Sequence, residues 1–100
     1  MTTPSAVHLD EAFLGEEQAK DAFNSIIAHA EVGDLIQARG MYDVLVALSI
    51  AYPDKESLRH WQSKGAVNLL CYYGQAGDLT QARGMYDTLT VLAIAHPDAG

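Results

Sequence analysis

The chain is poor in cysteine and in positive charge, and each shortage excludes a class of function. Its 100 residues include one cysteine, Cys71, so an internal disulfide framework is excluded and a reducing, cytoplasmic setting is expected. Six lysine and arginine residues face 13 aspartate and glutamate residues, which gives a net charge of −7. That balance disfavours nucleic acid and anionic membranes as partners, because phosphate groups are bound by clustered cations. It suits solubility or a basic partner.

Long apolar runs are also missing from the sequence. No segment approaches the roughly 20 apolar residues that a membrane-spanning helix needs. Residues 1–10 have neither the cationic start nor the apolar stretch of a secretory signal. The hydrophobic fraction of 49% is nevertheless that of a folded globular protein, and 100 residues correspond to one small domain. We therefore expect a single domain without a membrane segment.

Signatures of catalysis and metal binding are absent as well. The histidines are scattered without an HxxxH or HExxH spacing: His8, His29, His60 and His96. No glycine-rich phosphate loop is present, and Glu16 and Glu17 are adjacent on an expected helix, so they do not face each other. Cys71 is expected on the apolar side of a helix, as an inert buried thiol. The sequence therefore predicts no catalytic residue, no cofactor and no metal site.

What the sequence does contain is an internal repeat. Residues 33–54 read GDLIQARGMYDVLVALSIAYPD and residues 77–98 read GDLTQARGMYDTLTVLAIAHPD, with 16 of 22 positions identical at an offset of 44 residues. The preceding segments, 11–32 and 55–76, match more weakly at the same offset. Repetition of this length indicates stacked supersecondary units. The single domain therefore divides into three parts: an N-terminal arm (1–10), a first repeat (11–54) and a second repeat (55–98).

Each repeat has the apolar periodicity and the end signals of two helices. Apolar residues recur at steps of three and four, which is the helical period. Asp34 and Asp78 each precede such a run and are followed three residues later by glutamine, a capping-box pattern. Asp54 is the expected N-cap of the third helix, and Pro53 and Pro97 end the second and fourth. The four expected helices span 11–31, 35–51, 55–75 and 79–95.

Two pairs of glycines recur with the repeat. Gly33 and Gly77 stand at the ends of the first helix of each unit, where a left-handed residue is commonly needed. Gly40 and Gly84 lie inside helices, where each costs about 1 kcal/mol relative to alanine. Their recurrence predicts that a neighbouring helix packs closely against them.

A pattern of five residues in the second repeat is typical of a known family. An aromatic residue, a glycine, a large residue, an alanine and a second aromatic follow at steps of 4, 2, 3 and 4: Tyr73, Gly77, Leu79, Ala82 and Tyr86. The first repeat has a histidine at the first of these positions: His29, Gly33, Leu35, Ala38 and Tyr42. On this pattern the chain resembles tetratricopeptide repeats, although its unit has 44 residues instead of 34, a length similar to that of some bacterial repeat arrays. Ile26 and Leu70 also depart from the small residue that the family prefers there.

The resemblance implies an all-α fold of antiparallel helix hairpins that stack into a superhelix. It also implies a non-catalytic module that binds a peptide or protein segment in a groove lined by the first helix of each repeat. Lys20 with Asn24, and Lys64 with Asn68, recur at i, i+4 on these helices. The resemblance implies that the four hold a terminal carboxylate, for which ammonium and amide groups are suitable donors. The alternative is that the lysines are solvated and the asparagines tie one helix to the next.

The C-terminal helix predicts a second kind of contact. Two repeats are fewer than the three expected for independent stability, and the last helix carries an apolar set that a neighbour should cover: Leu89, Val91, Leu92 and Ile94. A homodimer through this helix is one solution, since two-fold pairing is the commonest closed arrangement. A different protein partner, or residues 1–10 folded back, are the others. The alternative function is thus a self-associating assembly unit without a separate ligand.

Three further features have structural and functional interpretations. Arg39 with Asp43, and Arg83 with Asp87, are spaced for i, i+4 ion pairs on an exposed face, which is the favoured interpretation, and a second binding ridge is the alternative. Trp61 either fills the core or anchors an interface.

Overall fold

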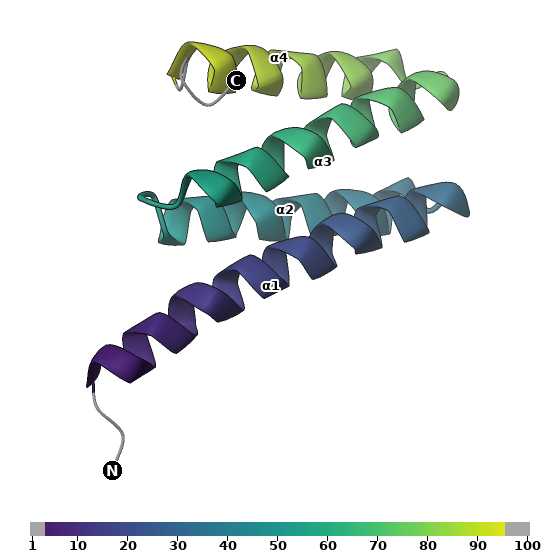
Figure 1. Cartoon of the computed structure of the whole chain (residues 1–100). Coiled ribbons are helices and arrows are strands. Elements are labelled where there is room, and N and C mark those ends of the chain that lie inside the picture. Colours follow the sequence, from purple (N-terminus) through teal and green to yellow (C-terminus); the bar gives the residue numbers. More distant parts are fainter. Residues whose placement is uncertain (1–3, 96–100) are drawn as a thin grey trace.

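The computed structural model describes residues 4–95, and within this range the chain consists of four α-helices and no strands. Their bounds are α1 Pro4–Glu31, α2 Leu35–Ala51, α3 Glu56–Gln75 and α4 Leu79–Ala95 (Figure 1). The predicted all-α fold class is confirmed, and the last three helices lie within one residue of their expected bounds. The first helix begins seven residues earlier than expected, so most of the segment assigned to an arm belongs to α1. The signal was Pro4, because proline is favoured at the first helical position.

The turn inside each hairpin has the predicted capping geometry. Gly33 and Gly77 have φ angles of +83° and +80°, which alanine or larger residues rarely adopt. Asp34 Oδ1 accepts a hydrogen bond from the Gln37 N–H at 3.1 Å, and Asp78 Oδ1 accepts the equivalent bond at 3.2 Å. The two turns are therefore the same structure repeated, and both predictions from sequence are confirmed.

The start of α3 differs from the expectation. The N-cap is Lys55, which makes no side-chain capping hydrogen bond, and Asp54 lies one residue too early to cap. The backbone N–H of Leu58 bonds to the Lys55 carbonyl at 3.1 Å, which sets the first turn. Arg59 Nη1 donates to the Pro53 carbonyl at 2.6 Å and ties the helix to the preceding turn. The first turn of α3 therefore has no carboxylate cap, and Arg59 fixes the preceding turn instead of capping the helix.

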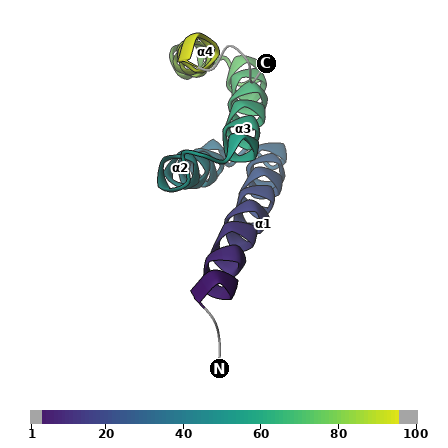
Figure 2. The same ribbon diagram turned by 60° about the vertical axis from the view of Figure 1, so that its left-hand side comes forward.

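The helices pack as two successive hairpins. Figure 2 shows α1 and α3 on one side of the molecule and α2 and α4 on the other. α1 packs on α2, α3 packs on α4, and α3 also packs on both helices of the first hairpin. Within the described chain, α4 has a helix neighbour only in α3. The two hairpins therefore have unequal surroundings, with α3 at the centre.

The core lies between α3 and the first hairpin. Its largest fully buried side chains are Ile26, Leu45, Leu58, Leu69 and Met85. Burying one such side chain stabilises the fold by about 1.5–3 kcal/mol. Four of the five come from α1, α2 and α3, and α4 contributes Met85 alone. In all, α4 contributes two buried apolar residues to the core, Ala82 and Met85, which is fewer than each of the other helices contributes.

Close helix packing occurs at a glycine that the sequence did not single out. A Cβ atom at Gly65 would lie 2.9 Å from Leu45 Cδ1 and 3.1 Å from Ile26 Cδ1, so the absence of a side chain lets α3 approach both helices of the first hairpin. At Gly40 and Gly84 the same added atom would meet nothing within 4 Å. The prediction that a neighbour packs against Gly40 and Gly84 is therefore wrong.

Candidate functional site

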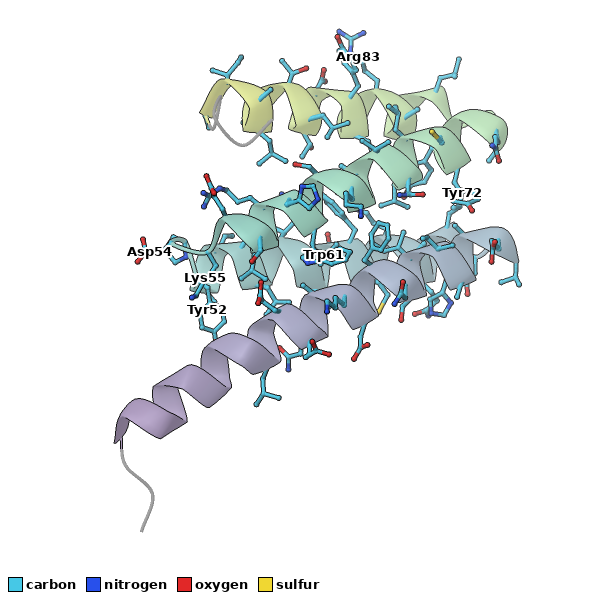
Figure 3. The ribbon with its side chains drawn as sticks, viewed as in Figure 1. Tyr52, Asp54, Lys55, Trp61, Tyr72 and Arg83 are labelled. Atoms are coloured by element: carbon cyan, nitrogen blue, oxygen red, sulfur yellow. The ribbon has the colours of Figure 1, made fainter. Side chains whose placement is uncertain are left out.

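The face shared by α1 and α3 carries an aromatic pair beneath a lysine. The rings of Phe23 on α1 and Trp61 on α3 lie 5.4 Å apart between centroids, at an interplanar angle of 52°. Lys64 Nζ is 4.8 Å from the Trp61 ring centre and 5.3 Å from the Phe23 ring centre. Such distances place the ammonium in cation–π contact with both rings. Figure 3 shows Trp61 between the two helices, so the cluster marks the seam of this face.

The two candidate lysines differ in what surrounds them. Lys20 Nζ lies 3.5 Å from the Glu17 carboxylate, and the Lys20 side chain is 53% exposed. An exposed pair of this kind contributes about 0–1 kcal/mol, so an incoming carboxylate can replace Glu17 at little cost. Within the described residues, Lys64 has no carboxylate at ion-pair distance and rests on the rings instead. Lys64 is therefore the stronger candidate for binding an anionic group.

One of the two candidate asparagines, Asn68, is less available than the sequence implies. Asn68 Nδ2 donates to the backbone carbonyl of Lys64 at 2.9 Å, so its amide group is turned back onto its own helix. This bond supports a structural role, although within α3 instead of between helices. Asn24 is exposed on α1. The structure thus brings Lys64 together with two aromatic rings and leaves Asn68 partly committed to the backbone.

The same face has an acidic end. Glu16 Oε1 accepts a hydrogen bond from Ser57 Oγ at 2.5 Å, which joins α1 to the first turn of α3. Glu17 and Asp21 follow on α1, with Asp21 exposed. Because charge changes from negative near Glu16 to positive near Lys64, a bound segment would be oriented along the helices.

A shallow hollow of about 470 Å³ lies on another part of the molecule, where the second hairpin turn meets α2. Arg39 Nη1 donates to Gln81 Oε1 at 3.3 Å across it, and Arg39 Nε lies 3.5 Å from Asp43. The guanidinium is also 5.7 Å from the Tyr42 ring centre. Of these three contacts, the bond to Gln81 joins the two hairpins, and the contacts with Asp43 and Tyr42 hold Arg39 in place on α2. The residues that line this hollow are Leu35, Ile36, Arg39, Tyr73, Ala76, Asp78 and Gln81.

Among the residues that the structure describes, no group of three or more histidine, cysteine, aspartate or glutamate side chains is placed to hold a metal ion. Cys71 is exposed, so the expectation of a buried thiol is wrong, because α3 leaves that side uncovered. Burial raises the pKa of the Tyr42 hydroxyl, which accepts a hydrogen bond from Gln62 Nε2 inside the core and not at the α1–α3 face. None of the described helices has the length and apolarity to cross a membrane.

The four apolar residues expected to form one face of the last helix are divided by the structure. Val91 and Ile94 are 63% and 76% exposed. Leu89 and Leu92 are partly buried, and Leu89 packs against the core. The set therefore points in two directions, and a partner that covers Val91 and Ile94 would lie on the outer side of α4.

No protein-family model, no curated protein and no solved structure is similar enough to this chain to count as a match. The resemblance to tetratricopeptide repeats therefore rests on the spacing of residues in this sequence.

Proposed function

We propose that this chain is a non-catalytic protein–protein interaction module of tetratricopeptide-like type, which binds the C-terminal segment of a peptide or protein on the α1–α3 face. The observation that carries the proposal is the Lys64 ammonium held over the rings of Trp61 and Phe23. A lysine already ordered against two rings loses less side-chain entropy when it binds a carboxylate. Aromatic groups beside it supply the apolar contact that commonly anchors an interface.

The charges on the face define the ligand further. Lys64 is suited to a single carboxylate, and Lys20 supplies a second ammonium once Glu17 is displaced. The net charge of −7 and the acidic end at Glu16 disfavour a ligand with many acidic residues. The proposed ligand therefore has an apolar C-terminal residue with a free carboxylate, preceded by basic residues. The apolar side chain would rest on Trp61 and Phe23, and the basic residues would lie toward Glu16.

Peptide binding to single-residue variants tests this proposal. Labelled peptides of that composition, each with a free or an amidated C-terminus, are titrated with the chain and followed by fluorescence anisotropy. Lys64→Ala should weaken binding of the free-carboxylate peptides about tenfold, which is what loss of a contact of about 1.4 kcal/mol gives. Lys20→Ala should weaken it by about threefold, because Lys20 must first leave Glu17.

Lys55→Ala is the matched control, since Lys55 is an exposed lysine at the start of α3 and outside the aromatic seam. It should leave binding unchanged. Equal binding of amidated and free peptides, or equal losses in Lys55→Ala and Lys64→Ala, would show that only general charge attraction is involved. Circular dichroism should confirm that all three variants keep the wild-type helix content.

A second candidate function is self-association of the chain as a structural unit, without a separate ligand. The observation that favours it is the exposed apolar surface of α4, where Val91 and Ile94 are 63% and 76% exposed. Light scattering across a dilution series separates the two candidates. A dimer that Ile94→Asp converts to monomer, with no effect of Lys64→Ala on any binding, would favour self-association.

The cytoplasm is the compartment that we propose for either function. The single cysteine, Cys71, is exposed on α3 and has no partner within the chain. An accessible unpaired thiol is typical of a protein kept in a reducing environment.

A further inference from the structure

Three side chains of the first hairpin form a socket that receives Gly65 of α3. The socket consists of Ile26 on α1 with Tyr42 and Leu45 on α2, and we call it the first socket. A Cβ atom at Gly65 would lie within 2.9–3.4 Å of one carbon of each. The three side chains are 0%, 2% and 1% exposed, so α3 covers them completely. A residue without a side chain is what allows this approach.

A glutamine fixes the position of α3 on the first socket. Gln62 Nε2 donates to the Tyr42 hydroxyl at 3.3 Å, and Gln62 Oε1 accepts from Ser49 Oγ at 2.9 Å. Gln62 is 7% exposed, and buried polar groups of this kind are satisfied only by a partner in the right register. The first socket therefore recognises a helix by two features at a spacing of three residues, a glutamine followed by a glycine.

The second hairpin carries a similar socket in uncovered form, although Ala93 stands at the position of Ser49 and offers a glutamine no second hydrogen bond. At the repeat offset of 44 residues, Ile26, Tyr42 and Leu45 correspond to Leu70, Tyr86 and Leu89, which we call the second socket. Tyr86 is 56% exposed, and Leu70 and Leu89 are only partly buried. The two hairpin turns have the same backbone hydrogen bonds and glycine conformation, so the helices that carry the two sockets are joined in the same way.

We propose that the second socket binds an amphipathic helix of a different protein that has the chemistry of α3. That helix carries glycine or alanine in contact with Tyr86 and Leu89, and a glutamine three residues earlier that bonds to the Tyr86 hydroxyl. Leucine four residues after the small residue would correspond to Leu69, which is fully buried where α3 covers the first hairpin. The surface is distinct from the α1–α3 seam that holds Lys64 and Trp61, so its occupant is independent of the ligand proposed there.

A second copy of this chain does not offer such a helix. The helix of a second copy that would stack in the same way is α1, where Asp21 stands at the position of Gly65 and Ser25 at that of Leu69. A carboxylate pressed among a tyrosine and two leucines would be buried without a partner. Head-to-tail stacking of copies at the second socket is therefore disfavoured, which is why the proposed partner is a different protein.

The first experiment uses a segment of the chain itself as the probe. A synthetic peptide of residues 55–76, which contains α3, is titrated into the full-length protein by calorimetry. We expect one peptide per chain, with binding weakened about tenfold or more by Tyr86→Ala in the protein, as for a central aromatic anchor. The same loss is expected when the peptide carries Gly65→Leu. Ile94→Ala, on the outer side of α4, is the matched control and should change nothing.

The second experiment joins the probe to the chain, which raises its effective concentration. Residues 57–76 are added directly after Gly100, and this keeps the 44-residue register because Pro97 and Asp98 correspond to Pro53 and Asp54. The extended protein should unfold at a higher Tm than the same protein with Gly65→Leu in the added copy only. Tyr86→Ala should remove the difference between the two.

Each of the other results contradicts the proposal. Equal Tm values for the two extended proteins, together with no peptide binding, would show that the second socket is not a docking site. Peptide binding that persists in Tyr86→Ala would show exchange with the chain's own α3 at the first socket. A dimer of the unmodified chain that becomes a monomer in Tyr86→Ala would assign the second socket to a second copy.

Discussion

Helices α2 and α4 have nearly the same sequence in two different surroundings. α2 lies between α1 and α3, whereas α4 packs on α3 alone within the described chain. Tyr42 is 2% exposed and its counterpart Tyr86 is 56% exposed, yet the outward Ile50 and Ile94 are exposed alike, at 72% and 76%. The outer face of the helix is therefore a property of its sequence, and the burial of its inner face depends on the neighbour. Paired substitutions in the two helices can measure how much that neighbour contributes.

The largest difference in the free energy of unfolding is expected between Leu45→Ala and Leu89→Ala. Leu45 is 1% exposed beneath α3, so its truncation should lower the free energy of unfolding by about 3 kcal/mol, including the cavity left behind. Leu89 is only partly buried, so the same change should cost about 1 kcal/mol. Urea denaturation followed by circular dichroism at 222 nm measures both values.

Leu48→Ala and Leu92→Ala provide a control for this pair, because both leucines are partly buried in their helices. The two substitutions should lower the free energy of unfolding by similar amounts. If Leu89→Ala proves as destabilising as Leu45→Ala, then α4 is covered in solution, and the difference between the helices disappears on association.

Substitution of the helical glycines by alanine should change the free energy of unfolding by smaller amounts, and the sign of the change should differ between positions. Gly40→Ala and Gly84→Ala should each raise the free energy of unfolding by about 0.5–1 kcal/mol, because alanine is the better helix former and the added methyl meets nothing within 4 Å. Gly65→Ala should lower it by about 1 kcal/mol, since overpacking against Leu45 and Ile26 outweighs that gain. Thermal unfolding of the three variants gives the order of their stabilities. A stabilising Gly65→Ala would mean that the first socket has room for a side chain.

Local features of this fold could be predicted from the sequence because their causes lie within a few residues. The caps at Asp34 and Asp78 and the left-handed glycines Gly33 and Gly77 follow from backbone groups three or four positions away. The helix bounds follow from the apolar period and the prolines. Where the local signal was weak, as at Lys55, the prediction placed the cap one residue too early.

Contacts between helices could not be predicted in the same way. Gly40 and Gly65 are both helical glycines in the sequence, and only the packing of α3 on the first hairpin shows which of them is crowded. The pairing of Lys64 with Phe23 joins residues 41 positions apart, through a crossing of α1 and α3 that no periodicity specifies. Sequence therefore identified Lys64 as a candidate but not the rings that hold it, and it assigned Cys71 to the wrong environment.

The free energies of unfolding of Tyr42→Phe and Tyr86→Phe should differ by about 1 kcal/mol at neutral pH. Removing the Tyr42 hydroxyl leaves Gln62 Nε2 buried without its acceptor, which costs about 0.5–1.5 kcal/mol. The Tyr86 hydroxyl is on an exposed side chain, so its removal should be neutral within about 0.3 kcal/mol. Chemical denaturation at pH 7 measures the pair, and equal effects would contradict a structural role for the Gln62 contact.

Tyr42→Phe should also change how stability responds to alkaline pH. Burial raises the pKa of Tyr42 above its ordinary value of 10.0, so above that pH the unfolded chain loses this proton while the folded chain keeps it. Stability from this group is therefore present below about pH 10 and is lost as pH rises through the folded-state pKa. Tyr42→Phe should reduce the fall in the free energy of unfolding between pH 9 and 11, which urea denaturation at a series of pH values measures.

The smallest difference in the free energy of unfolding is expected between Arg39→Ala and Arg83→Ala. Both arginines face an aspartate four residues later, Asp43 at 3.5 Å and Asp87 at 3.1 Å, and an exposed pair of this spacing contributes about 0.3–0.5 kcal/mol. Arg39 also bonds to Gln81 across the two hairpins, so its loss should cost about 0.5 kcal/mol more. Figure 3 shows Arg83 on the outer side of α4, away from the other helices.

Salt separates the two contributions to this last difference. Screening at 1 M NaCl weakens the ion pairs of both arginines, so the cost of Arg83→Ala should fall toward zero. The Arg39 bond to the neutral Gln81 side chain is screened less, and the aliphatic part of Arg39 lines the hollow beside Leu35. A residual cost of Arg39→Ala at high salt would therefore measure the link between hairpins. Equal residual costs would mean that the hairpins are held together by α3 alone, and that the repeated Arg–Asp pairs contribute only within their own helices.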